Sequence, residues 1–489
     1  MYKFFKTIAE SNSCTLKGAC TIHPSVSALS LVLQEEIKEI SYYLVKLKEL
    51  NFSNQEINDF CISALSIFLI NTSFNKKKYL NLVNELNLIK IQAKEKYMSH
   101  CKEKNIPCEM INNEFELKNN NLQISQLIKH AEFLNINKQK NCEKQRLRLF
   151  ELIALFAKLC AIVSKQIKKE NGETNELNYE ILRFLALSNS FSIRQEKLKR
   201  RILEFCEIFE KALKKLDSLK EKNYGEKTSA KVNLYQQKGH SILISGDDIS
   251  ELKKLLDDIE ASKKENINVY THGAMFYAHF FPSFQNNPYL KGHLGTNTAE
   301  YDFSNFQGAI LLTQNFVQKI DSLYRGDIFS NKIISFDKVL DIKNNDYLPL
   351  VEMAEKIKEF DEKTVEKTKE VSYDKIKIIN FLKTFSQDEI IIVVGNIENS
   401  EFFIEYKNKK VLNLNCPCDS EIIFEIIEIL KNKQVKISLF FAQCNVMNLK
   451  IIFALLNKNL KIYTTNCPHV LINPHVVEAL IEDFKLKII

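Results

Sequence analysis

Cysteine and histidine side chains follow three apolar segments near the end of the sequence, and thiols and imidazoles are the side chains that bind soft metals. The segments KKVLNLNC, VKISLFFAQC and LKIYTTNC each read as a buried β-strand that ends in a cysteine. Parallel strands end at the same edge of a sheet, which is the edge where ligands bind in α/β proteins. The candidate ligands are therefore Cys416, Cys418, Cys444, Cys467 and His469.

Two explanations of this pattern stay open. The Cys-Pro-Cys and Cys-Pro-His spacings suit zinc or copper(I). Alternatively, these small and weakly polar side chains suit the crowded ends of strands and bind nothing. A metal site requires at least three sulfur atoms within roughly 4 Å of one another. The strands that carry the cysteines must therefore be neighbours in the sheet.

A second polar group lies in the middle of the chain, between Gly239 and Phe329. The runs HSILIS and INVYT are short and β-branched, and they end in the polar corners Ser-Gly-Asp-Asp and Thr-His-Gly. The two aspartates precede an amphipathic segment and are expected to cap a helix. His272 and His279 are the side chains of this region that could act as acids or bases.

The elements that position these residues begin with helices. Residues 25–222 are predicted to form helical bundles, because glycine and proline are rare and apolar residues recur at steps of three and four. Ser53 followed by Glu56 predicts a capping box at the start of the second helix. The clearest apolar stripe consists of Val26, Leu29, Leu33, Ile37, Ile40, Leu44 and Leu47.

From about residue 240, short apolar runs alternate with helical segments, which is typical of parallel sheets built from βαβ units. The predicted fold is multidomain α + α/β, with amino-terminal helical bundles and two Rossmann-like, doubly wound parallel-sheet domains. The predicted domains are residues 1–224, 225–372 and 373–489. A charged stretch, VEMAEKIKEFDEKTVEKTKEV, is predicted to be a helical linker at the end of the second domain.

Composition limits the classes of function. The 489 residues are 45% hydrophobic and 26% charged, with a formal net charge of +7 and no block of basic residues interleaved with aromatics. We therefore expect a globular protein that does not bind nucleic acid. The sequence shows no signal peptide and no apolar run of about 20 residues, so we expect a cytoplasmic protein that does not bind membranes. Its twelve cysteines are expected to be reduced, with Cys61, Cys160 and Cys206 buried as small hydrophobes.

Four segments together carry a resemblance to a known family. GHSILISGDD, YTHGAMFYAH, NFQGAILLTQNF and LYRGDIF resemble segments of the hybrid cluster proteins, also called prismane proteins or hydroxylamine reductases. The family versions run roughly VSGHD, YTHGEM with a following AH, FPGAI with TTNC, and a basic RIF corner. The resemblance covers nearly the whole chain and implies the same fold. It also implies that His272 and His279 flank a family glutamate and support the strand-to-helix corner.

The resemblance implies a hybrid iron–sulfur–oxygen cluster held by seven side chains, most of which this sequence replaces. By this resemblance, Asp247 takes the place of a histidine, and Ala442 takes the place of a glutamate near the end of the family sequence. Either Cys416 or Cys418 matches one of the two remaining cysteine positions. Three further positions carry side chains that cannot bind metal, and these are Ala274 in place of glutamate, Phe316 in place of cysteine, and Ile397 in place of the cysteine that bears an extra sulfur. We therefore expect the hybrid cluster to be absent.

The amino-terminal cluster of the family is expected to be absent as well. CTLKGAC keeps Cys14 and Cys20 at the family spacing, but the upstream Cys-x-x-Cys pair is missing, and an iron–sulfur cubane uses four thiolates. The degenerate motif at residues 14–20 could hold a cluster only if two chains shared it. Otherwise the two thiols bind nothing.

Two functions remain open. Family members reduce hydroxylamine or nitric oxide with electrons from a redox partner, whereas this chain is expected to have a binding or regulatory role, as a homo-oligomer or with an intact relative. The alternative is an oxidoreductase with a metal or iron–sulfur site rebuilt from the strand-end cysteines. A redox partner is expected only if a cluster is present. The sequence assigns no residue as catalytic, so whether the chain is an enzyme stays open.

Overall fold

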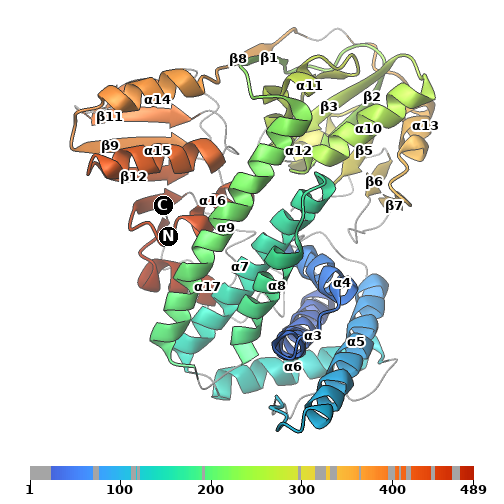
Figure 1. Cartoon of the computed structure of the whole chain (residues 1–489). Coiled ribbons are helices and arrows are strands. Elements are labelled where there is room, and N and C mark those ends of the chain that lie inside the picture. The colour runs from blue at the N-terminus through green and yellow to red at the C-terminus, as the bar shows by residue number, and fades with distance from the viewer. Residues whose placement is uncertain are drawn as a thin grey trace. The chain divides into compact units, whose positions relative to one another are not determined.

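The structure is a computed structural model that divides into two compact units (Figure 1). The first unit comprises residues 1–69, 73–212 and 468–484, and the second comprises residues 70–72, 213–467 and 485–489. The domain boundaries predicted after residues 224 and 372 stay predictions. The structure describes residues 24–69, 76–111, 117, 122–141, 143–189, 193–295, 299–313, 327–330, 339–362, 365–394, 402–406, 409–414, 420–441, 446–464 and 474–488.

The first unit is helical, as predicted. Its first helix, α3, carries the apolar stripe, and all of the stripe residues from Leu29 to Leu47 are buried. The described helices of this unit are α3 (Pro24–Glu49), α4 (Gln55–Leu65), η1 (Ser66–Leu69), α5 (Lys76–Glu103), α6 (Ile124–Asn141), α7 (Lys144–Lys169), α8 (Asn175–Ala186), η2 (Leu187–Asn189), the first part of α9 (Gln195–Tyr224), α17 (Pro474–Glu478) and the π-helical turn η4 (Ala479–Asp483).

Helix α7 lies in the core of this unit, because most of its residues from Leu147 to Ile167 are buried. The Phe156 ring makes edge-on contacts with three aromatic rings at centroid distances between 5.0 and 5.7 Å, namely Phe184 of α8 and Phe205 and Phe209 of α9. Cys160 in α7, Cys61 in α4 and Cys206 in α9 are fully buried. The prediction that these three cysteines are small core residues is confirmed.

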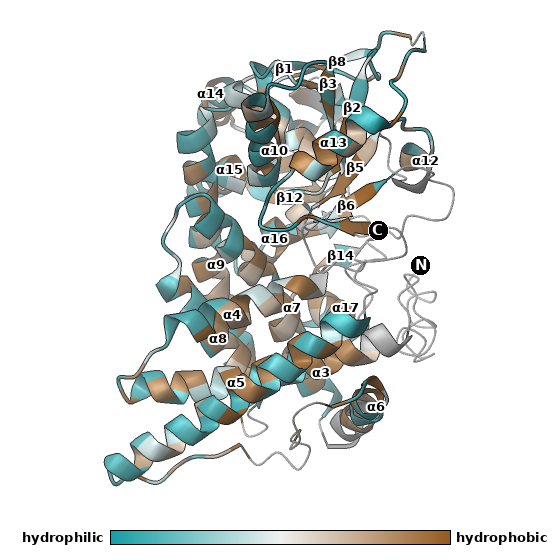
Figure 2. Cartoon of the chain, turned by 90° about the vertical axis from the view of Figure 1, so that its right-hand side faces the viewer, coloured by the Kyte–Doolittle hydropathy of each residue, from teal (hydrophilic) through white to brown (hydrophobic). Residues whose placement is uncertain are grey.

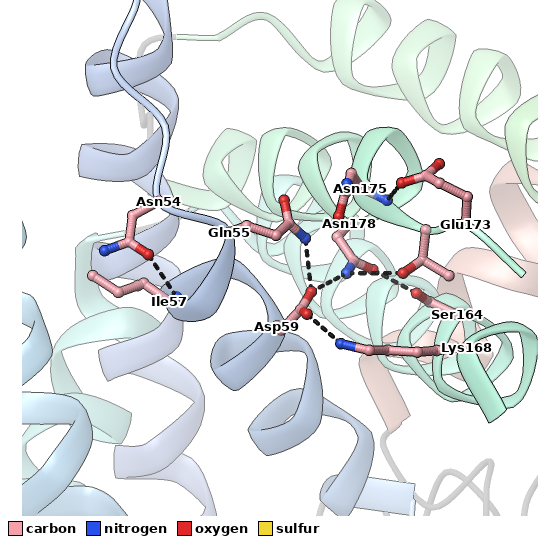
Figure 3. Close-up of polar contacts among 10 residues, drawn as sticks. Asn54, Gln55, Ile57, Asp59, Ser164, Lys168, Glu173, Asn175 and Asn178 are labelled. Atoms are coloured by element: carbon pink, nitrogen blue, oxygen red, sulfur yellow. Dashed lines mark hydrogen bonds and ion pairs between the residues drawn. The ribbon is translucent and has the colours of Figure 1, made fainter. Parts of the chain in front are cut away.

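A polar network joins α4, α7 and α8 (Figure 3). Asp59 of α4 accepts hydrogen bonds from Gln55 Nε2 at 2.8 Å and from Asn178 Nδ2 at 2.7 Å, and it pairs with Lys168 of α7. The Asn178 amide oxygen in turn bonds Ser164 Oγ. Asn178 and Ser164 are buried, so these bonds supply the partners that buried polar groups require.

The second unit contains two six-stranded sheets, and the first is entirely parallel. Its strand order is β4-β3-β2-β5-β6-β7, the order of dinucleotide-binding Rossmann sheets. Its strands are β2 (His240–Ser245), β3 (Ile267–His272), β4 (Leu290–His293), β5 (Ala309–Leu312), β6 (Ile328–Ser330) and β7 (Val339–Asp341). Its helices are α10 (Ile249–Ser262), η3 (Gly273–Phe280), α11 (Pro282–Gln285), α12 (Ala299–Ser304) and α13 (Leu348–Lys356).

Helices cover both faces of this sheet, because the strands are apolar on both. Ile242 and Ile244 of β2 belong to the core that includes α10 and α13. Leu243, between them in the strand, packs with Phe303 of α12 on the opposite face. In Figure 2, β5 and β6 have the colour of hydrophobic residues, whereas α10 is largely hydrophilic on the side shown. This pattern is that of a doubly wound sheet buried on both sides.

The second sheet has the order β10-β11-β9-β12-β13-β14 and is parallel except for the antiparallel edge strand β10. Its strands are β9 (Glu389–Val394), β10 (Phe403–Tyr406), β11 (Lys409–Leu414), β12 (Lys436–Phe441), β13 (Lys461–Thr464) and β14 (Lys487–Ile488). Its helices are α14 (Lys375–Thr384), α15 (Ser420–Asn432) and α16 (Val446–Ala454). The predicted α + α/β fold with two parallel-sheet domains is confirmed.

Among its described residues, the charged stretch predicted as a helical linker is helical only in its first part. Helix α13 ends at Lys356 and packs on the first sheet through Leu350 and Val351. Further along, β8 (Thr368–Val371) pairs with β1 (Ala230–Asn233) as an antiparallel two-stranded sheet. Val371 is buried in the same core, so tertiary packing overrides the helical preference of this lysine- and glutamate-rich sequence.

Candidate functional site

The first sheet reverses its strand order between β2 and β5, which is where ligands bind in folds of this kind. β2 ends at Ser245, and Gly246 follows with a φ of 146°, a conformation that favours glycine. Asp248 caps α10, since its Oδ1 accepts a hydrogen bond from the backbone N–H of Ser250 at 3.3 Å. The predicted capping role is confirmed for Asp248.

Asp247 has a different role, because its side chain forms an ion pair with Lys450 of α16. Lys450 Nζ lies 3.1 Å from Asp247 Oδ2, and the two side chains are 2% and 1% exposed. The Met447 sulfur lies 3.8 Å from the same ammonium, and Met447 belongs to the apolar core of the first sheet. With so little water near the pair, the attraction between its charges is strong, and burying either charge alone would be costly.

This pair decides which chemistry Asp247 can perform. One carboxylate oxygen is held by the Lys450 ammonium, and the other, Oδ1, is buried without a hydrogen-bond partner among the described residues. Ala274, at the start of η3, ends in a methyl group and packs against the apolar core. Asp247 and Ala274 are the two described positions of the ligand set that the resemblance implies. They do not fit ligation by histidine and glutamate.

His272 forms part of a polar chain on the α12 face of the sheet. Its Nδ1 lies 2.9 Å from Ser245 Oγ, and its Nε2 lies 3.2 Å from Asp302 Oδ2. Gly295 adopts a φ of 128° beside the ring, and a β-carbon there would lie 2.4 Å from His272 Cδ2. The imidazole is buried and has a partner at each nitrogen. It therefore holds the ends of β2 and β3 together.

His279 belongs to a second polar group, on the other face. Thr271 Oγ1 lies 2.8 Å from His279 Nε2 and 2.9 Å from His293 Nδ1. Burial lowers the pKa of His279 to about 4, although a hydrogen bond with the Gly292 backbone raises it in part. Burial lowers the pKa of His293 well below its usual range, and the charges of His279 and His272 add to this. Both rings of this group are therefore neutral at pH 7.

The expectation that His272 and His279 support the strand-to-helix corner is confirmed by these bonds. Each histidine bonds a side chain of β2 or β3, the strands that run into the corner. A buried imidazole with its nitrogens occupied and its pKa lowered, as in His279, is poorly suited to exchange protons with a substrate.

Most of the predicted site residues lie outside the described residues, and their roles stay predictions. Several of them follow a described strand in the sequence. Phe316 follows β5, Ile397 follows β9, and Ala442 follows β12. The predicted positions outside the described residues are Cys14, Cys20, Phe316, Ile397, Cys416, Cys418, Ala442, Cys444, Cys467 and His469.

The strand order bears on the strand-end cysteine site. β12 and β13, which precede Cys444 and Cys467, are direct neighbours. β11, which precedes Cys416, is separated from β12 because β9 pairs with both of them. Strands two positions apart lie about 9.6 Å from each other. A site that includes Cys416 or Cys418 therefore has to bridge across the end of β9.

Within the described ranges, no three side chains of histidine, cysteine, aspartate or glutamate gather as metal ligands do. Among the helices that the structure describes, none is both long enough and apolar enough to span a bilayer.

Lys450 is the site residue that sequence reasoning missed. It lies in VMNLKIIFA, a helical segment in which Asn448 is the other polar residue. Lysine is almost never fully buried unless it is paired, so a single lysine in such a segment signals a buried counter-charge. The sequence gives that signal, but it does not identify Asp247 as the partner across 203 residues.

Comparison with known proteins agrees with the fold. Residues 7–467 match the Prismane/CO dehydrogenase family. The chain is 25% identical over 360 residues to the hydroxylamine reductase of Halothermothrix orenii, covering 71% of this chain and 63% of that protein. It is 26% identical over 404 residues to that of Thermodesulfovibrio yellowstonii, covering 81% and 71%, respectively. The chain belongs to the Prismane/CO dehydrogenase family.

Proposed function

We propose that this chain is a member of the family that does not reduce hydroxylamine and that acts as a binding or regulatory protein. The observation that carries the proposal is the buried ion pair between Asp247 and Lys450. Relatives of this chain are named hydroxylamine reductases, and the resemblance gives Asp247 the place of a cluster-binding histidine. Here that place holds a carboxylate whose charge is neutralised by an ammonium group.

The charge of Lys450 argues against an iron cluster beside Asp247. A carboxylate that binds iron donates its oxygen electrons to the metal, whereas Oδ2 of Asp247 accepts a hydrogen bond from Lys450. The pair is shielded from water, so the ammonium holds this oxygen strongly and a metal would have to displace it. Ala274 supplies no ligand atom, and by resemblance Phe316, Ile397 and Ala442 supply none either.

Metal analysis of anaerobically purified protein tests the proposal. We expect neither iron nor acid-labile sulfide at stoichiometric levels, and no hydroxylamine reduction above the background with a reduced viologen as electron donor. The Thermodesulfovibrio yellowstonii hydroxylamine reductase, prepared in parallel, is the positive control. A cluster signal in electron paramagnetic resonance together with turnover would refute the proposal.

Three variants locate any metal that does bind. Iron that is lost in Cys14→Ser belongs to the amino-terminal pair, which requires two chains to share a cluster. Iron or zinc that is lost in Cys418→Ser or Cys444→Ser belongs to the strand-end cysteines, and would favour the rebuilt oxidoreductase site. Metal retained in all three variants is not bound at either place.

The partner in the binding role is proposed to be a second copy of this chain or an intact relative. Analytical ultracentrifugation distinguishes these two partners. The chain is measured alone, and then in an equimolar mixture with an intact family member. A mass of one chain under both conditions would contradict this part of the proposal and leave the metal prediction standing.

A further inference from the structure

Two cysteines of the helical unit, Cys101 and Cys108, meet in one packed cluster of side chains although seven positions separate them in the sequence. Cys101 is in the last turn of α5 and is 1% exposed. Cys108 lies in the segment that follows, is partly exposed, and packs against the same apolar cluster, which contains Tyr43, Tyr97 and Cys101. Neither thiol takes part in the site described above.

The end of α5 explains why the two thiols meet. The helix stops at Glu103, and Asn105 adopts a φ of 54°. The Ile106 backbone N–H then donates a 3.0 Å hydrogen bond to the Cys101 carbonyl. This is the hydrogen-bond pattern of a helix that ends by reversing its direction, so the chain after Ile106 returns along the last turns of α5.

Bonds along the returning segment fix the position of Cys108. The backbone N–H of Glu109, the next residue, donates to the Tyr97 hydroxyl at 3.1 Å. The Cys108 sulfur lies 4.0 Å from the Met98 carbonyl oxygen. A helical side chain covers the turn that precedes it, so the Cys101 thiol lies over that same turn.

The proton affinities of the thiols agree with this geometry. The pKa of Cys108 is raised to about 11, chiefly by a hydrogen bond with the Cys101 thiol and secondarily by burial. Burial raises the pKa of Tyr97 to about 12, and a hydrogen bond with the Cys101 thiol raises it further. Cys61, Cys160 and Cys206, the other cysteines among the described residues, are each fully buried in a helix.

We propose that Cys101 and Cys108 are a site of reversible oxidation and form a disulfide when the protein meets a peroxide. Cys108 is the more exposed thiol and reacts first. Because a hydrogen bond and burial raise the pKa of Cys108 to about 11, little of its thiol is ionised at neutral pH, so the reaction is slow there and speeds up as the pH rises. The thiolate attacks one oxygen of hydrogen peroxide and the O–O bond breaks. The leaving hydroxide takes up the proton that the thiol released, so the products are a sulfenic acid and water. The Cys101 sulfur then displaces the sulfenic hydroxyl as a second water, and the S–S bond forms. One peroxide is reduced and two thiols are oxidised.

The disulfide would fix a segment that links two helices. Tyr42 of α3 donates a 3.0 Å hydrogen bond to the Glu109 carbonyl, and Lys46 of α3 pairs with the Glu109 carboxylate at 2.6 Å. Glu109 is exposed, so solvent competes for both contacts while the thiols are reduced. A covalent bond at Cys108, the adjacent residue, would hold the segment against α5 even where solvent breaks the contacts of Glu109.

Trypsin cleavage and mass spectrometry of the full chain test this proposal. The protein is treated with hydrogen peroxide at about pH 8.5, where more of the thiol is ionised, and then cleaved. Lys102 and Lys104 lie between the two cysteines and are exposed, so cleavage there leaves two peptides joined only by the disulfide. We expect the joined pair after peroxide treatment and separate peptides after subsequent reduction.

The variant Cys108→Ser serves as the matched control, because it replaces one sulfur by oxygen at a partly exposed position. It should fold as the original protein does and yield no joined peptides. Three outcomes would overturn the proposal: a disulfide between other cysteines, a sulfinic acid at Cys108 with Cys101 still a thiol, or two thiols unchanged under peroxide that oxidises free cysteine.

Discussion

Asp247 and Lys450 form an ion pair whose members depend on each other for their stability in the fold. Removing one partner of a buried pair leaves a charge without compensation, which typically costs about 3–5 kcal/mol. We therefore expect Lys450→Met to lower the free energy of unfolding by about that amount. The double variant Asp247→Leu with Lys450→Met should recover most of the loss, because apolar pairs of similar size often replace buried ion pairs.

Urea unfolding measures both effects, and an exposed ion pair provides the control. Lys238 and Asp361 lie 2.9 Å apart in the same unit, with side chains 69% and 60% exposed. Lys238→Met should change the free energy of unfolding by less than about 1 kcal/mol. An equally small effect of Lys450→Met would mean that water reaches the buried pair.

His279 gives the protein a stability that depends on pH. Its pKa is lowered by burial from 6.5 to about 4, so the unfolded chain takes up the proton first as the pH falls. Stability that is fully present above pH 6.5 is therefore lost between pH 6.5 and 4. His279 alone should account for a loss of ~3 kcal/mol over this range, and His293 should add to the loss in the same direction.

Denaturant unfolding at several pH values between 4 and 7 tests this dependence. The variant His279→Gln keeps a polar group beside Thr271 and cannot take up the proton. Its stability should vary less with pH than that of the original protein. Identical pH profiles for the two proteins would show that His279 is accessible to protons in the folded state.

Among the elements, α4, α7 and α8 are tied together by the polar network around Asp59 (Figure 3). Asn178 contributes the buried part of this network, since it donates to Asp59 and bonds Ser164. Asn178→Ala leaves Ser164 without this partner in a buried place, so we expect a loss of about 1–3 kcal/mol in the free energy of unfolding.

Lys168→Ala is the control for this network. Lys168 also pairs with Asp59, but its side chain is 60% exposed, so its removal should cost less than about 1 kcal/mol. A larger loss from Lys168→Ala than from Asn178→Ala would contradict the view that burial decides the strength of these bonds. Thermal or urea unfolding ranks the two variants.

Local patterns in the sequence predicted which helices and strands form better than they predicted the residues at which these elements begin and end. The apolar stripe of α3 and the apolar runs of the sheet strands were sufficient to predict that these elements exist. A buried face of a helix or strand requires apolar residues at the period of that element. The start of α4 was predicted one residue early. Asn54, not Ser53, is the N-cap, and its Oδ1 accepts from the Ile57 N–H at 3.3 Å. Both residue types cap helices well, so their spacing alone does not separate them.

Pairings between distant residues were not predictable in the same way. The helical preference of the charged stretch failed at β8, because its partner β1 lies more than 130 residues earlier. Asp247 was identified as a site residue, but the Lys450 ammonium that defines its chemistry comes from α16. A single sequence does not show which distant residues are in contact, whereas the apolar periodicity that predicts burial can be seen within each segment.

At the scale of the whole molecule, the chain returns to the helical unit near its end. Arg148 of α7 is buried and pairs with three acidic residues of this returning segment, namely Glu478, Glu482 and Asp483. Lys199 of α9 also pairs with Asp483, at 2.8 Å. The helical unit is therefore completed by residues that are far from it in the sequence.

This return predicts how a fragment of residues 1–224 would behave. Without α17 and η4, Arg148 would lose all three of its carboxylate partners, and the apolar surface that they cover would be exposed. We expect the fragment to unfold at a lower temperature than the same unit in the full chain, by several degrees. Circular dichroism melting measures this difference.

Arg148→Met is the matched variant for that experiment. In the full chain it should destabilise the protein, because it removes the buried cation that the three carboxylates share and leaves Asp483 with Lys199 and Glu478 with Lys144. In the fragment it should stabilise, because it removes a charge that has lost its partners. Destabilisation by Arg148→Met in both contexts would mean that Arg148 acts through other contacts.

The Asp247–Lys450 pair also limits the mutational paths open to this chain. A substitution at either position alone passes through a protein with an uncompensated buried charge, so both codons have to change together or in close succession. A change to histidine at residue 247 meets the same barrier while Lys450 remains. Descendants of this sequence should therefore retain or exchange the two residues as a unit, and this covariation would be visible in an alignment of close relatives.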